Sequence, residues 1–243
     1  MPRLPKDIPL PVLVLFAVDV LLLFVYLVHY FLGRPFGRII TRLIDLDAER
    51  NISTWFSSLQ LFLIGLLFVI LAYLLQQRGV REGVKWYWLL ALVFVSLSLD
   101  EFAGVHEQLG LISDALLPGG DREGTVFQRT GIWMFLLGIP FIIFMLLVAR
   151  KLHEHVAGRG FTRLFLTGFA VFIGSAVGIE ILANFTVGRP MIWSILQISA
   201  EEFGEMVGAT IMFWATWRLL EHYGITIAAP ATIPGTTVET RAG

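Results

Sequence analysis

The sequence lacks cysteine entirely and has few charged residues for its length. With no cysteine among 243 residues, disulfide bonds, thiolate metal ligands and thiol catalysis are excluded. Only 15% of the residues are charged and 56% are hydrophobic, and the mean hydropathy is +0.77. These values exclude an ordinary soluble domain and indicate a membrane protein. The formal net charge of -1 gives no electrostatic basis for binding nucleic acid.

Long hydrophobic runs divide the chain into six segments that predict membrane-spanning helices. Each run is long enough to cross a hydrocarbon layer of roughly 30 Å as a helix of about 20 residues. The first run is too long for a cleavable signal peptide, and no small-residue cleavage site follows it. We therefore predict an all-α polytopic membrane protein with a six-transmembrane-helix bundle. The six segments are 8–32, 54–77, 86–110, 130–150, 161–185 and 194–221.

Two further segments lie outside these runs. Between residues 35 and 47, apolar residues such as Phe36, Ile40 and Leu43 cover one helical face, which predicts an amphipathic helix on the outer membrane surface. From 225 to 243 the chain is rich in Ala, Pro and Thr without apolar periodicity. We expect this tail to be disordered and cytoplasmic, so that residues 1–224 form a single transmembrane domain.

The distribution of lysine and arginine predicts how the chain is oriented. The two termini and the loops 78–85 and 150–163 carry eleven of the 18 Lys and Arg residues, and the loops of the opposite side carry the other seven. Loops with more Lys and Arg stay in the cytoplasm. We therefore expect both termini on the cytoplasmic side of the plasma membrane, which in a bacterium is the inner membrane.

Lysine and arginine are missing from the places where acidic residues enter the hydrophobic runs. Eight carboxylates lie inside these runs, and no Lys or Arg lies deep among them. A charge in a bilayer costs roughly 2.5–3.5 kcal/mol even on lenient insertion scales, so such residues face the protein interior and mark function. Protons or metal ions must therefore neutralise the group. The eight are Asp19, Asp100, Glu101, Glu107, Glu180, Glu201, Glu202 and Glu205.

Seven of these carboxylates are predicted to share one depth in the membrane. At a rise of about 1.5 Å per residue, they all fall in the outer leaflet, although their helices alternate in direction. Asp19, near the middle of the first helix, is set apart. Helical periodicity places most of the seven on seams that also carry small residues, which favour close helix contact. One seam is Ser96, Asp100, Ala103, Gly104 and Glu107, and the other is Gln197, Glu201, Gly204, Glu205 and Gly208.

This donor set suits a hard divalent metal, which we expect to be iron or manganese, bound as one or two ions. His106 is the imidazole inside the group, about 120° around the helix from Asp100, so both can face one centre only if the helix bends. His29 is a second candidate imidazole. The predicted metal ligands are Asp100, Glu101, His106, Glu107, Glu180, Glu201, Glu202 and Glu205.

Three functions fit these residues. We favour a redox metalloenzyme with a di-iron or di-manganese centre that acts on a lipid-phase substrate such as a quinone, although the Glu-x-x-His motif of soluble di-iron bundles is absent. The first alternative is a divalent-cation or proton-coupled transporter, for which Asp19 is the sole acidic stepping stone toward the inner leaflet. The second is an accessory subunit that assembles with partner membrane subunits. No catalytic nucleophile is identified.

Four local features complete the predictions. Pro140 predicts a kink in the fourth helix. Gly174 and Gly178 predict a packing contact on the fifth helix, separate from the face that Glu180 and Asn184 share. On the second helix, neutral oxygen ligands or supporting hydrogen bonds for the acidic site are expected from Ser57, Ser58 and Gln60.

Overall fold

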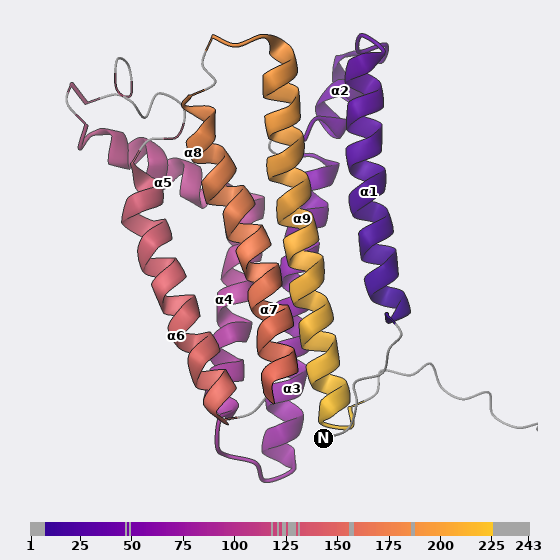
Figure 1. Ribbon diagram of the computed structural model, residues 1–243, viewed down its shortest axis with the longest axis vertical. Coiled ribbons are helices and arrows are strands. Elements are labelled where there is room, and N and C mark those ends of the chain that lie inside the picture. The colour runs from indigo at the N-terminus through magenta and orange to yellow at the C-terminus, as the bar shows by residue number, and fades with distance from the viewer. Residues whose placement is uncertain are drawn as a thin grey trace, which may run out of the picture.

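The computed structural model of the chain is built from helices (Figure 1). It describes residues 8–46, 48, 50–117, 119–120, 122, 125, 130, 132–155, 158–185 and 188–225, and no strand occurs in them. The all-helical prediction is therefore confirmed. The predicted disordered tail lies outside the described residues beyond Ile225.

Five helical stretches are long and apolar enough to cross a membrane, which indicates membrane association. Three are single helices: α1 (Leu10–Phe31), α3 (Ile52–Gln77) and α4 (Val84–Ala103). The fourth joins the π-helix η1 (Met134–Gly138) to α6 (Ile139–His155), and the fifth joins α7 (Gly158–Ile173), the π-helix η2 (Gly174–Ile179) and α8 (Glu180–Ala183). The long helix α9 (Met191–His222), which contains four glutamates, is not among the five. The helices α2 (Arg38–Ile44) and α5 (Val105–Asp114) are short.

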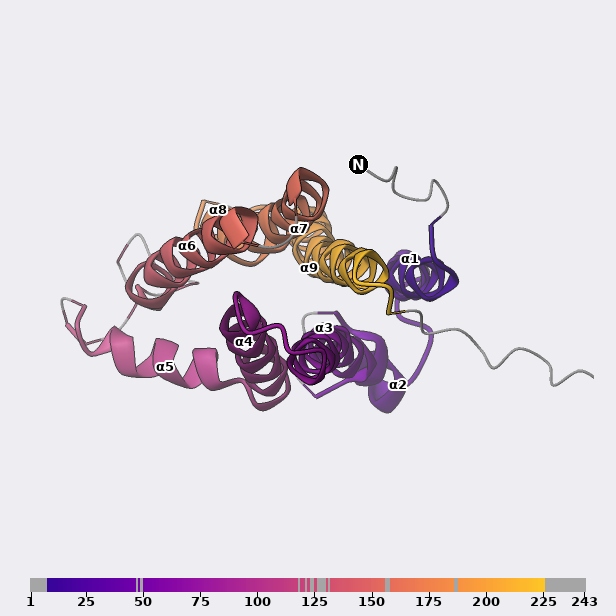
Figure 2. The same cartoon turned by 90° about the horizontal axis from the view of Figure 1, so that it is seen from below.

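The helices form two layers when seen along the bundle (Figure 2). One layer holds α6, α7, α9 and α1, and the other holds α5, α4, α3 and α2. Because α9 contacts α1 and α7 within its own layer and α3 in the other, it is the helix around which the bundle packs. Between the layers, the buried rings of Phe68, Phe94 and Phe165 lie 6.0–6.3 Å apart. This aromatic cluster joins α3, α4 and α7.

Glycine allows α7 and α9 to approach at backbone distance. A Cβ added to Gly208 would lie 2.5 Å from the Phe172 nitrogen, one added to Gly168 would lie 2.8 Å from the Gly208 carbonyl oxygen, and one added to Gly204 would overlap Ser175. The predicted small-residue seam of α9 is thus a packing surface. The packing contact predicted at Gly174 and Gly178 is wrong, because no described atom lies within 4 Å of a Cβ at either position.

The third hydrophobic segment is not the single helix 86–110 that its periodicity predicts. α4 ends at Ala103, Gly104 has the left-handed φ of 62°, and α5 starts at Val105 in a new direction (Figure 1). The Gly104 N–H donates to the Asp100 carbonyl oxygen at 2.8 Å, a left-handed helix end that glycine adopts without steric cost. The predicted seam is therefore broken, and Asp100 and Glu107 belong to different helices.

Two of the predicted spans contain a π-helical segment. The segment η1 ends two residues before Pro140, where a proline ring would clash with the carbonyl four residues earlier in an α-helix. A π turn at that place accommodates the proline. In the fifth span, η2 ends at Ile179 and the helix resumes at Glu180.

Candidate functional site

Five glutamates from three helices come together at the end of the bundle that carries α5 and α8. Glu205 on α9 lies within electrostatic reach of Glu202, Glu101, Glu201 and Glu180. Glu101 comes from the last turn of α4 and Glu180 opens α8. All five are half-buried. We call Glu101, Glu180, Glu201, Glu202 and Glu205 the acidic cluster.

The local sequence explains why these carboxylates meet. On α9, Glu201 and Glu205 are four residues apart and therefore share one face with Gly204 and Gly208, the glycines packed on α7. Glu180 is the first residue after the π segment η2, which follows α7 directly. The sequence has no Lys or Arg within 86–121, 164–188 or 190–217. The helices that carry the cluster therefore bring no basic side chain of their own to its level.

Asp100 and His106 form a separate pair across the bend at Gly104. The His106 backbone N–H donates to Asp100 Oδ1 at 2.8 Å, and His106 Nδ1 lies 3.1 Å from Asp100 Oδ2. The bend thus brings together two side chains that a straight helix would hold about 120° apart. It also places the Asp100 carboxylate at the N-terminus of α5, where a negative charge is favourable. The His106 ring packs on Trp133, with centroids 5.3 Å apart.

In the part of the chain that the structure describes, no three His, Asp or Glu side chains are arranged so as to hold a metal ion. The side chain of the predicted ligand Glu107 lies outside the described residues. Asp100 and His106 bind each other, whereas the acidic cluster offers carboxylate oxygens of the kind that hard cations prefer. Of the predicted ligands, the five glutamates of the acidic cluster supply oxygens of this kind.

A cavity of about 450 Å³ lies between the start of α3 and the end of α4. Its lining includes Arg50 and, at the end of α4, the two residues that follow Glu101 in the sequence. Its lining residues are Arg50, Asn51, Thr54, Trp55, Phe102 and Ala103.

Asp19 lies apart from the acidic cluster, in a hydrogen-bond network that we call the Asp19 network. Gln60 Nε2 donates to Asp19 Oδ1 at 2.8 Å, and Thr210 Oγ1 donates to Asp19 Oδ2 at 2.9 Å. Gln60 Nε2 also lies 2.8 Å from Thr210 Oγ1. All three side chains have no solvent exposure, so the network joins α1, α3 and α9 in the core of the bundle.

Sequence analysis missed the partners of several polar residues. It assigned Gln60 to the acidic site, but Gln60 belongs to the Asp19 network, and it did not single out Thr210. Ser58 donates to the Ser98 carbonyl oxygen at 2.7 Å and so links α3 to α4. His29 lies 3.1 Å from Thr41 Oγ1, which ties α1 to α2. These partners are distant in sequence, and no local pattern marks them.

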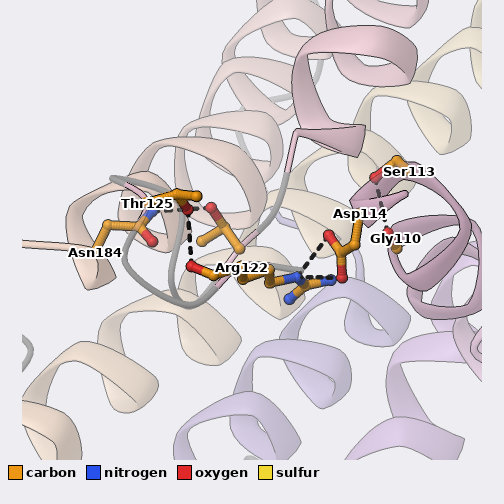
Figure 3. A network of polar contacts seen from close by, with 7 residues as sticks. Gly110, Ser113, Asp114, Arg122, Thr125 and Asn184 are labelled. Atoms are coloured by element: carbon orange, nitrogen blue, oxygen red, sulfur yellow. Dashed lines mark hydrogen bonds and ion pairs between the residues drawn. The ribbon is translucent and has the colours of Figure 1, made fainter. Parts of the chain in front are cut away.

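A polar network connects the segment after α5 to the helices on both sides of it (Figure 3). Arg122 Nε lies 2.8 and 2.7 Å from the two carboxylate oxygens of Asp114, and the Arg122 carbonyl oxygen accepts from Thr125. Asn184, just after α8, donates to Thr130 Oγ1 at 2.9 Å. Asn184 was predicted to share a face with Glu180, and its amide binds this segment.

The described residues thus form a helical protein with five helical stretches of membrane-spanning length and a cluster of five glutamates. The model of a family described as Domain of unknown function (DUF8692) matches residues 12–220, so the chain belongs to this family. No curated protein and no solved structure matches the chain.

Proposed function

We propose that the protein crosses the membrane six times, with α9 as the sixth span. At about 1.5 Å per residue, the 32 residues of α9 exceed the roughly 30 Å hydrocarbon thickness. Glu201, Glu202 and Glu205 of α9 join the acidic cluster, which removes them from lipid. The Lys and Arg distribution supports cytoplasmic termini in a plasma membrane, the inner membrane of a bacterium. The apolar residues Ile39 and Ile40 on α2 are 79% and 48% exposed, which supports a place for α2 on the membrane surface.

We further propose that the protein binds a divalent metal ion at the acidic cluster. The observation that carries this proposal is the approach of four carboxylates to Glu205. Carboxylates that repel one another inside a protein cannot all stay ionised without a cation, and carboxylate oxygens suit iron, manganese, magnesium or calcium. Binding then draws glutamate side chains together, since the described residues hold no preformed group of three ligands. A redox centre acting on a quinone or another lipid-phase substrate is the specific form that we favour.

Element analysis of protein purified without chelator tests the metal proposal. We expect at least one iron or manganese ion per wild-type chain, and a loss of most of it in the double variant Glu202→Gln, Glu205→Gln. The control Glu82→Gln, Glu154→Gln removes two carboxylates at the opposite end of the bundle and keeps the metal. Trace metal in the wild type, or equal metal in the cluster variant, contradicts the proposal.

The Asp19 network favours a second candidate, a proton-coupled or cation transporter. Thr210 follows Glu205 by five residues on α9, which is about 7.5 Å further along the helix. The Asp19 network therefore supplies buried polar groups between the acidic cluster and the opposite end of α9, where a proton or cation could bind during transport. Transport predicts cation uptake into sealed vesicles that Asp19→Asn abolishes and that the control Glu82→Gln leaves unchanged. Uptake that survives Asp19→Asn contradicts this candidate.

A further inference from the structure

The turn between α3 and α4 lies at the end of the bundle opposite α5 and α8 (Figure 1), and there it lines a basic cavity. The cavity has a volume of about 400 Å³, and its lining residues are Arg81, Glu82, Gly83, Lys85, Trp86 and Lys151. All but Lys151 belong to the turn between α3 and α4 or to the first turn of α4, and Lys151 belongs to the end of α6. Three cations face one carboxylate, so the lining carries a net positive charge.

The cavity lies where membrane spans end. Residues 77 and 84 bound the turn between two apolar helices, and the span that contains Lys151 ends at residue 154. Lys85 Nζ lies 5.4 Å from the centroid of the Trp86 ring, a cation–π distance, and tryptophan is typical of the membrane–water interface. Lys151 Nζ lies 2.8 Å from Glu154 Oε2, so Lys151 contributes less net charge than Lys85.

Exposed apolar residues run from both lysines along the spans. On α4, Trp88 and Leu92 follow Lys85 by three and seven residues and are 38% and 64% exposed. On α6, Leu147 precedes Lys151 by four residues and is 57% exposed. Residues with these spacings share a helix face. On each helix, the lysine at the basic cavity thus shares one face with exposed apolar residues. We call these residues, Trp88 and Leu92 on α4 and Leu147 on α6, the apolar columns.

We infer that the basic cavity binds the headgroup of an anionic phospholipid, whose acyl chains lie along the columns of α4 and α6. A cavity of this charge at the end of membrane spans suits a lipid phosphate. The apolar columns distinguish a lipid from a soluble phosphate compound, which has no chains to place there. A choline headgroup would bring its own positive charge against Arg81, Lys85 and Lys151. This inference does not depend on the acidic cluster.

Native mass spectrometry of the purified full chain tests the inference, with phosphatidylglycerol and phosphatidylcholine of identical acyl chains as probes. We expect the wild type to bind phosphatidylglycerol more tightly. The variant Lys85→Gln, Lys151→Gln is expected to lose affinity for it by about fivefold from Lys85, which corresponds to roughly 1 kcal/mol for a full charge, and by a smaller further factor from Lys151, which is paired with Glu154. The control Arg150→Gln, Arg163→Gln removes the same charge from exposed residues outside the cavity and is expected to bind like the wild type.

Three results would overturn the inference. If the wild type binds phosphatidylglycerol and phosphatidylcholine equally, the site is not selective for an anionic headgroup, whatever the variants do. If the variant Lys85→Gln, Lys151→Gln prefers phosphatidylglycerol over phosphatidylcholine as strongly as the control does, the lipid binds elsewhere. Displacement of phosphatidylglycerol by millimolar inorganic phosphate would show a site for free anions, whereas we expect phosphate to displace none. Both mutated lysines are exposed, so the variant is expected to elute from size exclusion as the wild type does.

Discussion

At the scale of single residues, the structure of the Asp19 network predicts that its hydrogen bonds, more than the charge of Asp19, stabilise the fold. Asparagine at position 19 keeps one acceptor, and Thr210 can turn its proton to the carbonyl of Met206, the backbone acceptor that helical threonine commonly reaches. We expect Asp19→Asn to change the free energy of unfolding by less than about 1 kcal/mol. Asp19→Leu has no acceptor for the buried Gln60 N–H that donates to Asp19 Oδ1, and leaving that donor unsatisfied costs about 1–3 kcal/mol.

Unfolding titrations in detergent micelles measure this difference. Thr210→Ser serves as the control, because it keeps the hydroxyl that donates to Asp19, and it is expected to stay close to the wild type. Equal destabilisation by Asp19→Asn and Asp19→Leu would contradict the prediction, since it would mean that the negative charge itself, and not the hydrogen bonds, holds α1, α3 and α9 together.

The sequence alone shows that Asp19 is separate from the other carboxylates, but it does not show which residues bind Asp19. A carboxylate in a hydrophobic run is visible from composition alone, because its burial is costly wherever it lies. Gln60 is 41 positions from Asp19, and Thr210 is 150 positions from Gln60. Only the packing of α1, α3 and α9 brings them together. The same holds for Asp100 and His106, whose contact depends on the backbone turn at Gly104.

At the scale of helices, the α7–α9 contact predicts that alanine is destabilising at one glycine of the fold and tolerated at another. A Cβ at Gly208 would lie 2.5–2.8 Å from backbone atoms of Phe172 and Gly168. These backbone atoms can move away only if the whole helix α7 moves. We expect Gly208→Ala to lower the free energy of unfolding by about 1–3 kcal/mol. Gly174→Ala, with open space around its Cβ, is expected to be neutral or to stabilise by up to about 1 kcal/mol. Unfolding titrations compare the two, and a Gly208→Ala protein as stable as Gly174→Ala would refute the close contact.

The boundaries of a helix could be predicted where the helix begins and ends with its hydrophobic run. The predicted segments 8–32 and 54–77 differ from α1 and α3 by two residues or fewer at each end. The break at Gly104 was missed because a glycine on a small-residue seam equally predicts helix packing, and only the backbone shows its φ of 62°. The π segments were missed because both spans are apolar on most faces, so the shift of register that an i→i+5 turn causes is not visible in the hydrophobic pattern.

At the scale of the whole molecule, charge is distributed asymmetrically along the bundle. The acidic cluster lies toward the end that carries α5 and α8, and the basic cavity lies at the other end. Because α9 extends from one end to the other (Figure 1), its crossing of the membrane decides whether these two regions face opposite sides. The Lys and Arg distribution then assigns the basic end to the cytoplasm.

The absence of native cysteine makes this topology directly testable with single introduced cysteines. Met191, at the start of α9, is 62% exposed, and His222, at its end, is also exposed. In intact cells, a membrane-impermeant maleimide is expected to label Met191→Cys, while His222→Cys reacts only after permeabilisation. Glu82→Cys, in the turn after α3, is the control for the cytoplasmic side and is expected to behave like His222→Cys. Labelling of both ends of α9 from one side would contradict the sixth span, and labelling of His222→Cys alone in intact cells would reverse the orientation.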